Sequence, residues 1–274
     1  PEVETTARGL RKRIVGLRVR DVRGVDWPRM LPNTSEAELR HALVGRCVLD
    51  VDRRGKYVLL RFEDETTVAI HRKMSGNLLL RRAGAAPEVH THLEVELLDG
   101  TLLRFVDPRK FGRVYLFRSS GELATFVAER LGPEPLGLLD GQVLLDRLRG
   151  RRGRIKTLLL DQAFLAGIGN LYADEALWEA GIHPLRSADA LTPADVQRLA
   201  AAIQGVLRLG VERRGTSFSS YLDAEGTPGR NQDFLHVYGR ANEPCPRCGT
   251  PISRILLGQR STHVCPSCQP LSRS

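Results

Sequence analysis

Two Cys-x-x-Cys pairs lie near the end of the chain, and 16 residues separate them. Cysteine pairs at this spacing place four thiolates around one Zn²⁺ in a tetrahedron. Because all four ligands are sulfur, no coordination position is left for water, so we expect one structural zinc ion. So short a segment cannot bury enough apolar surface to fold alone, and the metal must hold it. The expected ligands are Cys245, Cys248, Cys265 and Cys268.

The length and charge of the chain set wider limits. Its 274 residues exceed one ordinary hydrophobic core, which predicts two domains with a small appendage. The 41 Lys and Arg against 32 Asp and Glu give a net charge of +9, which favours a polyanionic partner. No apolar run approaches the length of a membrane span, and residues 1–13 are too charged for a secretory signal. With its cysteines clustered, the chain is predicted to be a soluble cytoplasmic protein.

The first half of the chain has the texture of a β-rich domain. An amphipathic helix is expected over 2–17, and short apolar runs separated by glycine turns follow it to about residue 117. Five or more such runs predict an antiparallel sandwich or barrel. The clearest runs are 47–51, 57–62, 67–70, 93–97 and 102–105.

A Gly- and Pro-rich stretch at 131–137 marks a linker, and the apolar period after it becomes helical. Asn170 is expected to cap a helix that begins after the turn Gly167–Gly169, and free N–H groups at such a helix start suit a phosphate. The basic run 149–156 just before it is either a solvated face or a clamp for a DNA backbone. A polar stretch, 214–231, is the candidate for a flexible loop.

Several residues of the β-rich part leave two interpretations open. Phe111 lies between basic residues in the turn 107–112 and is either a wedge that unstacks bases or a core residue at a strand start. Met74 is by default core filler. Lys56 follows a basic turn at the start of an apolar strand, which puts its ammonium at the rim of the domain.

Taken in order, these motifs resemble the formamidopyrimidine-DNA glycosylase family, which includes the endonuclease VIII branch. The resemblance covers essentially the whole chain. It implies an α+β multidomain fold: an N-terminal helix on an antiparallel β-sandwich, a helix–two-turn–helix domain and a β-hairpin zinc ribbon. The matching segments are 1–5, 53–57, 74–76, 107–112, 131–136, 167–175, 237–240 and the zinc ribbon. The domains would then be 1–117, a linker over 118–137, 138–228 and 229–274.

The resemblance also implies roles for particular residues. The catalytic group would be Pro1, Glu2, Lys56 and Arg260, and phosphate contacts would come from His90, Arg109, Arg152, Lys156, Asn170 and Arg260. Three residues, Met74, Arg109 and Phe111, match those that fill the gap left by an extruded base in the purine-lesion enzymes, which makes the wedge interpretation of Phe111 the favoured one.

The amino terminus departs from the family pattern. Family members begin Pro-Glu-Leu-Pro-Glu-Val-Glu-Thr and use the first proline as nucleophile, whereas this chain begins Pro-Glu-Val-Glu-Thr. Either Pro1 and Glu2 form the catalytic pair, or the nucleophile belongs to three residues that precede them and are absent from this sequence.

The resemblance implies a monomeric bacterial enzyme of base excision repair that works on damaged or abasic double-stranded DNA without contact to a membrane. It would be a bifunctional glycosylase and AP lyase that removes 8-oxoguanine and formamidopyrimidines through a Schiff base and β,δ-elimination. Two alternatives stay open: an endonuclease VIII-like enzyme for oxidised pyrimidines, and an inactive zinc-ribbon protein that binds damaged DNA.

Overall fold

The computed structural model describes residues 1–218 and 220–271. They form two compact units, each built from two segments of the chain. The first unit consists of residues 1–128 and 210–232, and the second consists of residues 129–209 and those from 233 on. Residues 210–232, the end of a long helix and the stretch that follows it, therefore pack with the amino-terminal part of the chain.

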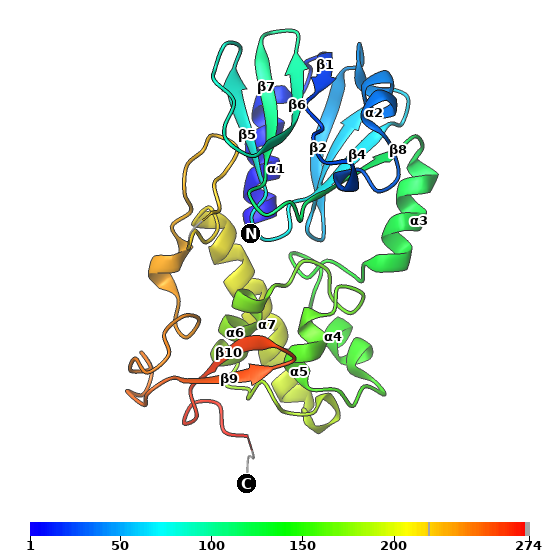
Figure 1. The fold of residues 1–274 in the computed structure, drawn as a ribbon. Coiled ribbons are helices and arrows are strands. Elements are labelled where there is room, and N and C mark those ends of the chain that lie inside the picture. Colours follow the sequence, from blue (N-terminus) through cyan, green and yellow to red (C-terminus); the bar gives the residue numbers. More distant parts are fainter. Residues whose placement is uncertain (219, 272–274) are drawn as a thin grey trace. The chain divides into compact units, whose positions relative to one another are not determined.

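Two four-stranded antiparallel sheets form the centre of the first unit (Figure 1). The first has the order β1 (Val19–Arg23), β6 (Thr91–Leu97), β7 (Thr101–Val106) and β5 (Asn77–Arg82). The second has the order β2 (Val48–Arg54), β3 (Tyr57–Phe62), β4 (Thr67–His71) and β8 (Arg113–Phe117). Buried and half-buried side chains alternate along β6 from Leu93 to Leu97, as expected of a strand with one face on the core.

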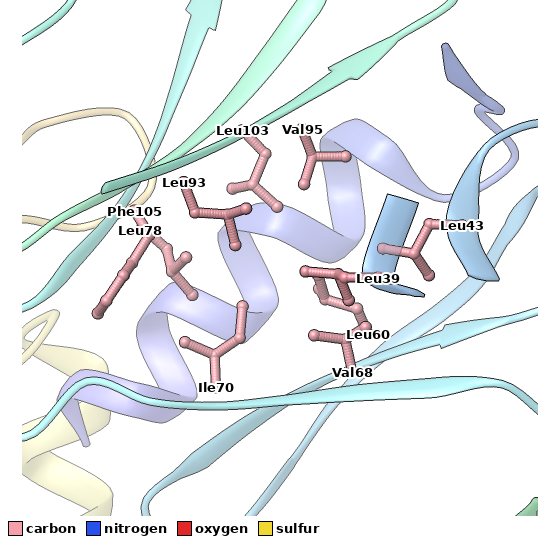
Figure 2. A pocket seen from close by; sticks show the side chains of 10 residues that line it. All are labelled: Leu39, Leu43, Leu60, Val68, Ile70, Leu78, Leu93, Val95, Leu103 and Phe105. Carbon is pink, nitrogen blue, oxygen red and sulfur yellow. The ribbon is translucent and has the colours of Figure 1, made fainter. Parts of the chain in front are cut away.

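The core between the sheets is made of hydrophobic side chains. Helix α1 (Glu2–Ile14) contributes Leu10 and Ile14, and α2 (Glu36–Leu43) contributes Leu39 and Leu43. Figure 2 shows ten of these side chains around a void of about 10 Å³. So small a space with only apolar walls is at the lower limit for one water molecule and offers it no polar partner.

The segment expected as a linker, 118–137, contains helix α3 (Ser120–Arg130). Its Phe126 packs on Tyr57, Tyr115 and Phe117, at ring-centroid distances of 5.5, 4.9 and 5.1 Å. The helix thus covers the outer face of the second sheet. The Gly- and Pro-rich stretch that predicted a linker covers only 131–137, after this helix ends.

The second unit is mainly helical. Its hydrophobic core comes from α4 (Gly141–Leu148), α5 (Ile155–Leu160), α6 (Asn170–Glu179) and α7 (Pro193–Glu212), whose last residues belong to the first unit. A two-stranded hairpin, β9 (Ser253–Leu257) and β10 (Arg260–Val264), lies beside α6 (Figure 1). Short 3₁₀ turns complete the chain: η1 (Pro28–Met30), η2 (Ala188–Ala190) and η3 (Asn231–Phe234).

The structure confirms the predicted fold class: along the chain, an amino-terminal helix is followed by antiparallel sheets, and a β-hairpin comes last. Helix α2 was not predicted, although Ser35 and Glu38 form a capping box at its start. None of the helices in the described residues is long and apolar enough to cross a membrane.

Candidate active site and nucleic-acid interface

The amino terminus carries an amine and a carboxylate side by side. Helix α1 begins at Glu2, so Pro1 is its N-cap, and the α-amino nitrogen of Pro1 lies 3.9 Å from Oε2 of Glu2. Burial lowers the pKa of this amine below its usual 8.0, and the nearby cations Arg53 and Lys56 lower it further, while Glu2 and Glu4 oppose them. A lowered pKa leaves more of the secondary amine neutral and nucleophilic at pH 7.

Lys56 reaches this region from a tight turn. Arg54 pairs with Tyr57 across the β2–β3 hairpin, so Gly55 and Lys56 form a two-residue turn, and Gly55 has a φ of 57° that suits glycine. The turn is held by Arg53, which donates to the carbonyl of Gly55 over 2.9 Å and to Glu4 over 2.8 Å. This arrangement fixes the backbone that carries the Lys56 ammonium.

The loop 214–231, in its described residues, contacts Glu2 within the same unit. The backbone N–H of Thr216 donates to Oε1 of Glu2 over 2.9 Å, and the Tyr221 hydroxyl donates to the Glu2 carbonyl over 3.3 Å. Gly215 has a φ of +82°, and a Cβ there would lie 3.0 Å from Cγ of Glu2 and 2.9 Å from Cε1 of Tyr221. Only glycine fits this approach, and the loop thereby orients the carboxylate.

The three predicted gap-filling residues meet at one exposed tip. The Arg109 guanidinium lies 4.6 Å from the centroid of the Phe111 ring, and its Nη1 is 4.0 Å from Sδ of Met74. Met74 is 74% exposed and Phe111 is 44% exposed. Neither side chain is core filler, and the three together make an apolar and cationic surface.

A buried carboxylate shapes this tip. Oδ2 of Asp107 accepts from the backbone N–H groups of Phe111 and Gly112 over 2.9 and 2.8 Å, and Oδ1 accepts from the Ser75 hydroxyl over 2.5 Å. The carbonyl of His90 accepts from the N–H of Asp107 over 3.0 Å, so His90, which is exposed, belongs to the same structure.

In the second unit, Asn170 and Lys156 both hold the strand that Arg260 begins. Nδ2 of Asn170 donates to the carbonyl of Ser261 over 2.8 Å, and Nζ of Lys156 donates to the Thr262 hydroxyl over 2.7 Å. Arg260 itself is exposed on β10. The preceding turn has left-handed backbone at Gly258 and Gln259, typical of a two-residue hairpin.

Two expectations change in this unit. Lys156 is fully buried and ion-paired with Asp174 at 2.6 Å, and burial lowers the pKa of its ammonium although Asp174 opposes this. Its ammonium faces the protein interior, because the hairpin covers it. The helix N-cap is Gly169 rather than Asn170, whose side chain is engaged by Ser261. Arg152 lies on an exposed loop, with 90% of its side chain accessible.

The four expected metal ligands form one cluster. The Sγ atoms of Cys245, Cys248, Cys265 and Cys268 all lie within 4.8 Å of one another. The sulfurs of Cys248 and Cys265 are 3.5 Å apart and those of Cys245 and Cys268 are 3.9 Å apart, close to the roughly 3.8 Å edge of a tetrahedron with 2.3 Å Zn–S bonds. Hydrogen bonds from Thr250 lower the pKa of Cys248 to about 6, which favours the thiolate. The residues fit a closed zinc site.

Two consecutive carboxylates on α6, which sequence reasoning missed, attach this cluster to the helix. Oδ2 of Asp174 accepts from the N–H of His263 over 2.9 Å. The carboxylate of Glu175 accepts from the N–H groups of His236, Val237 and Tyr238, each over 2.9 Å. The available signal was the occurrence of two adjacent acidic residues within the otherwise apolar stretch 171–178.

Comparison with known proteins decides the family. Residues 1–114 match the formamidopyrimidine-DNA glycosylase N-terminal domain, 131–221 match its H2TH domain, and 242–271 match a zinc finger found in FPG and IleRS. A formamidopyrimidine-DNA glycosylase of Herpetosiphon aurantiacus is 47% identical over 272 residues, covering 98% of both chains. The chain belongs to the formamidopyrimidine-DNA glycosylase family. Another such glycosylase, of Symbiobacterium thermophilum, is 48% identical over 99% of this chain and 88% of its own length.

Solved structures agree with this assignment. A complex of Lactococcus lactis Fpg with abasic-site DNA superimposes with a TM-score of 0.92 at 36% identity, over 98% of both chains. A complex of MutM with carbocyclic 8-oxo-G DNA gives a TM-score of 0.90 at 36% identity, again over 98% of both chains. The protein is therefore a DNA glycosylase of the formamidopyrimidine type that acts in DNA repair, and its zinc finger holds a structural zinc.

Proposed function

We propose that this glycosylase excises oxidised purines, 8-oxoguanine and formamidopyrimidines, from double-stranded DNA and cleaves the resulting abasic site as an AP lyase. The observation that carries the proposal is the buried secondary amine of Pro1, 3.9 Å from a carboxylate of Glu2 and within the field of Lys56. Solved relatives that bind abasic-site and Fapy-dG DNA support the substrate class.

The chemistry begins with nucleophilic substitution at the sugar. The lone pair of the Pro1 nitrogen attacks C1′, and the bond between C1′ and the base breaks with its electron pair leaving on the base. The bound amine then gives up its proton and Glu2 delivers a proton to the ring oxygen O4′, so that the C1′–O4′ bond breaks and an iminium forms between Pro1 and C1′. Lys56 supplies a cation beside the departing base.

Strand cleavage follows from the iminium. Its positive charge acidifies the proton on C2′, and loss of that proton expels the 3′ phosphate by β-elimination. A second elimination expels the 5′ phosphate, and Arg260 would assist it through contact with the phosphate. Water then hydrolyses the iminium and returns the free amine.

The damaged nucleotide must leave the helix, because stacked neighbours shield C1′ inside the duplex. Phe111, Arg109 and Met74 form a surface suited to the vacated space. Phosphates would be bound by His90, Arg109, Arg152, Asn170 and Arg260. Lys156 contributes through the hairpin that it supports, since its own ammonium is buried.

Borohydride trapping tests the reaction. With duplex DNA containing 8-oxoguanine, reduction should link the DNA to the amino-terminal residue, as peptide mass mapping would show. The same protein acetylated at its terminus is the matched control and should give no adduct. A mass-verified chain beginning at Pro1 that excises nothing and forms no adduct would refute the proposal for Pro1.

Two further arms separate the alternatives. A protein extended by Pro-Glu-Leu ahead of Pro1 shows whether the nucleophile lies three residues upstream, because the adduct would then map to the new first residue. Thymine glycol in place of 8-oxoguanine tests the pyrimidine-specific alternative. Faster release of thymine glycol than of 8-oxoguanine would contradict the assigned substrate class.

A further inference from the structure

A buried guanidinium lies next to the proposed active site, and within the described residues none of its hydrogen-bond acceptors is a carboxylate. Arg72 follows β4 and is only 6% exposed. Its Nε donates to the carbonyl of Gly76 over 2.7 Å, Nη1 to the Thr6 hydroxyl over 3.1 Å, and Nη2 to Oδ1 of Asn77 over 2.8 Å. All three acceptors are neutral.

Such a placement is costly in free energy. A guanidinium stays protonated in proteins, and a buried cation is normally matched by an anion. Burial lowers the pKa of Arg72, and the negative charge of Glu2 opposes this over a longer range. An apolar side chain would fill the same volume without that cost. Packing alone therefore does not explain why an arginine lies here, and the explanation must come from the parts of the fold that its hydrogen bonds connect.

On one side, Arg72 is tied to the loop 214–231. Its guanidinium lies 4.9 Å from the centroid of the Tyr221 ring. Asn77, which accepts from Arg72, also accepts from the N–H of Leu222 over 3.0 Å and donates to the carbonyl of Ser220 over 2.6 Å. The loop continues along β5, where Leu80 donates to the carbonyl of Ala224 (Figure 1).

On the other side, Arg72 is tied to the first turn of α1. The Thr6 hydroxyl that accepts from Arg72 donates to the carbonyl of Glu2 over 3.0 Å. The Tyr221 hydroxyl donates to the same carbonyl. One side chain thus connects the helix that begins with Glu2 to the loop whose Thr216 N–H binds the Glu2 carboxylate.

We infer that Arg72 is a positioning residue for excision: its three-way fork fixes the loop 214–231 against α1 and so sets the orientation of the Glu2 carboxylate. The inference rests on the proposed function for its catalytic consequence. The fastening of the loop is a separate claim that needs no catalysis. Two readouts can therefore be taken from each variant.

The first readout is limited proteolysis of the free protein. The loop and its borders contain Arg213, Arg214 and Arg230, which are trypsin sites. Arg72→Met, which keeps the apolar bulk but removes the fork, should accelerate cleavage there by about tenfold or more, because the loop opens locally. Arg104→Met is the matched control: Arg104 is also buried, but it binds Glu88 and Glu94 rather than residues of this loop.

The second readout is single-turnover excision of 8-oxoguanine at a temperature where each variant is fully folded. Arg72→Met should slow excision by about 10- to 100-fold while the Kd for lesion DNA changes less than about twofold, since misplacing a catalytic group costs rate rather than binding. Arg72→Lys, which keeps the charge and one donor group, should recover part of the rate.

The outcomes are distinct. Faster proteolysis with an unchanged excision rate would overturn the positioning role and leave the proposed function intact. Equal proteolysis of Arg72→Met and wild type would overturn the fastening itself. If wild type excises nothing, the proposed function fails, and proteolysis still decides the fastening. Should Arg72→Met not fold, Asn77→Ala removes the loop half of the same connection, and the same two results are expected from it.

Discussion

The indole N–H of Trp178 donates a hydrogen bond to Sγ of Cys245 over 3.4 Å. The ring of Trp178 also stacks on His236 at 4.4 Å and lies 4.1 Å from the guanidinium of Arg247. A metal-bound thiolate carries negative charge, so an N–H donor held this firmly stabilises the ligand form of the cysteine and its orientation. Helix α6 thus takes part in the zinc site without supplying a ligand.

Replacing Trp178 by Phe keeps the ring and removes the donor. We expect zinc release to a colorimetric chelator to become about tenfold faster, the lower end of the effect of losing a partner of a metal ligand. Trp27→Phe changes the other tryptophan of the chain, which lies in the first unit, and should leave the release rate unchanged. Equal release rates for the two variants would show that the hydrogen bond does not support the metal site.

The pH dependence of adduct formation reports on Pro1. The neutral amine is the reactive form, and burial with Arg53 and Lys56 lowers its pKa below 8.0, so trapping on abasic-site DNA should reach half of its plateau value below that pH. Lys56→Met removes one of these cations, which raises the pKa of Pro1 and moves the acid limb to higher pH. Lys56→Arg should keep the limb in place. If the midpoint of the acid limb is the same in Lys56→Met as in wild type, Lys56 has no electrostatic effect on Pro1, even if the plateau rate changes.

Local patterns in the sequence were enough to predict much of this molecule. The cysteine spacing identified the metal cluster because four ligands around one ion constrain the chain strongly. Short apolar runs predicted the strands β2, β3, β4, β6 and β7, and Phe111 was assigned to an exposed tip by family resemblance. Each of these features is set by neighbours within a few residues or by a motif.

Contacts between distant segments were out of reach. Nothing near Lys156 indicates that the hairpin more than 100 residues later buries it, or that Asp174 pairs with it. Likewise, nothing in the sequence near Arg72 indicates that Tyr221 and Asn77 connect it to the loop 214–231. Burial of a charge depends on what covers it, which the local sequence does not encode.

Asp195 should make the free energy of unfolding depend on pH in the acid range. Burial alone would raise its pKa, but the N–H and hydroxyl of Thr192 together with Arg186 and Arg198 lower it to about 2. The ionised form therefore stabilises the fold by about 2 kcal/mol, fully above its unfolded pKa of 3.8, and the benefit disappears as pH falls toward 2. Denaturant unfolding should show Asp195→Asn less stable than wild type at pH 7, with a smaller gap at pH 3. Asp189→Asn, at a half-exposed neighbour, should show no such gap.

Arg260 should account for part of the salt dependence of DNA binding. Each phosphate neutralised by a cation adds about 0.9 to the slope of log K against log salt. Arg260→Ala should reduce the slope by about one such increment, measured by fluorescence anisotropy with lesion DNA between low and moderate salt. Arg118→Ala removes an exposed arginine from the first unit that pairs with Glu38 and should leave the slope as it is. An unchanged slope in Arg260→Ala would remove this residue from the interface.

Asp107 should act on excision through Phe111. An ionised carboxylate can only accept hydrogen bonds. One oxygen of Asp107 accepts from two backbone N–H groups, and the other accepts from the Ser75 hydroxyl and the backbone N–H of Arg109. In Asp107→Asn the amide nitrogen must face donors on one of these sides, which costs about 1–3 kcal/mol and distorts the turn that carries Phe111. Excision of 8-oxoguanine should slow markedly in Asp107→Asn and in Phe111→Ala.

A double-mutant cycle decides whether the two effects are one. If Asp107 works by placing the Phe111 ring, Asp107→Asn should cost little further rate once the ring is absent, so the two losses combine to less than their sum. Single-turnover excision of the four proteins, each at a temperature where it is folded, gives the coupling. Fully additive losses would mean that Asp107 supports excision by another route, such as the position of His90, whose carbonyl accepts from its backbone N–H.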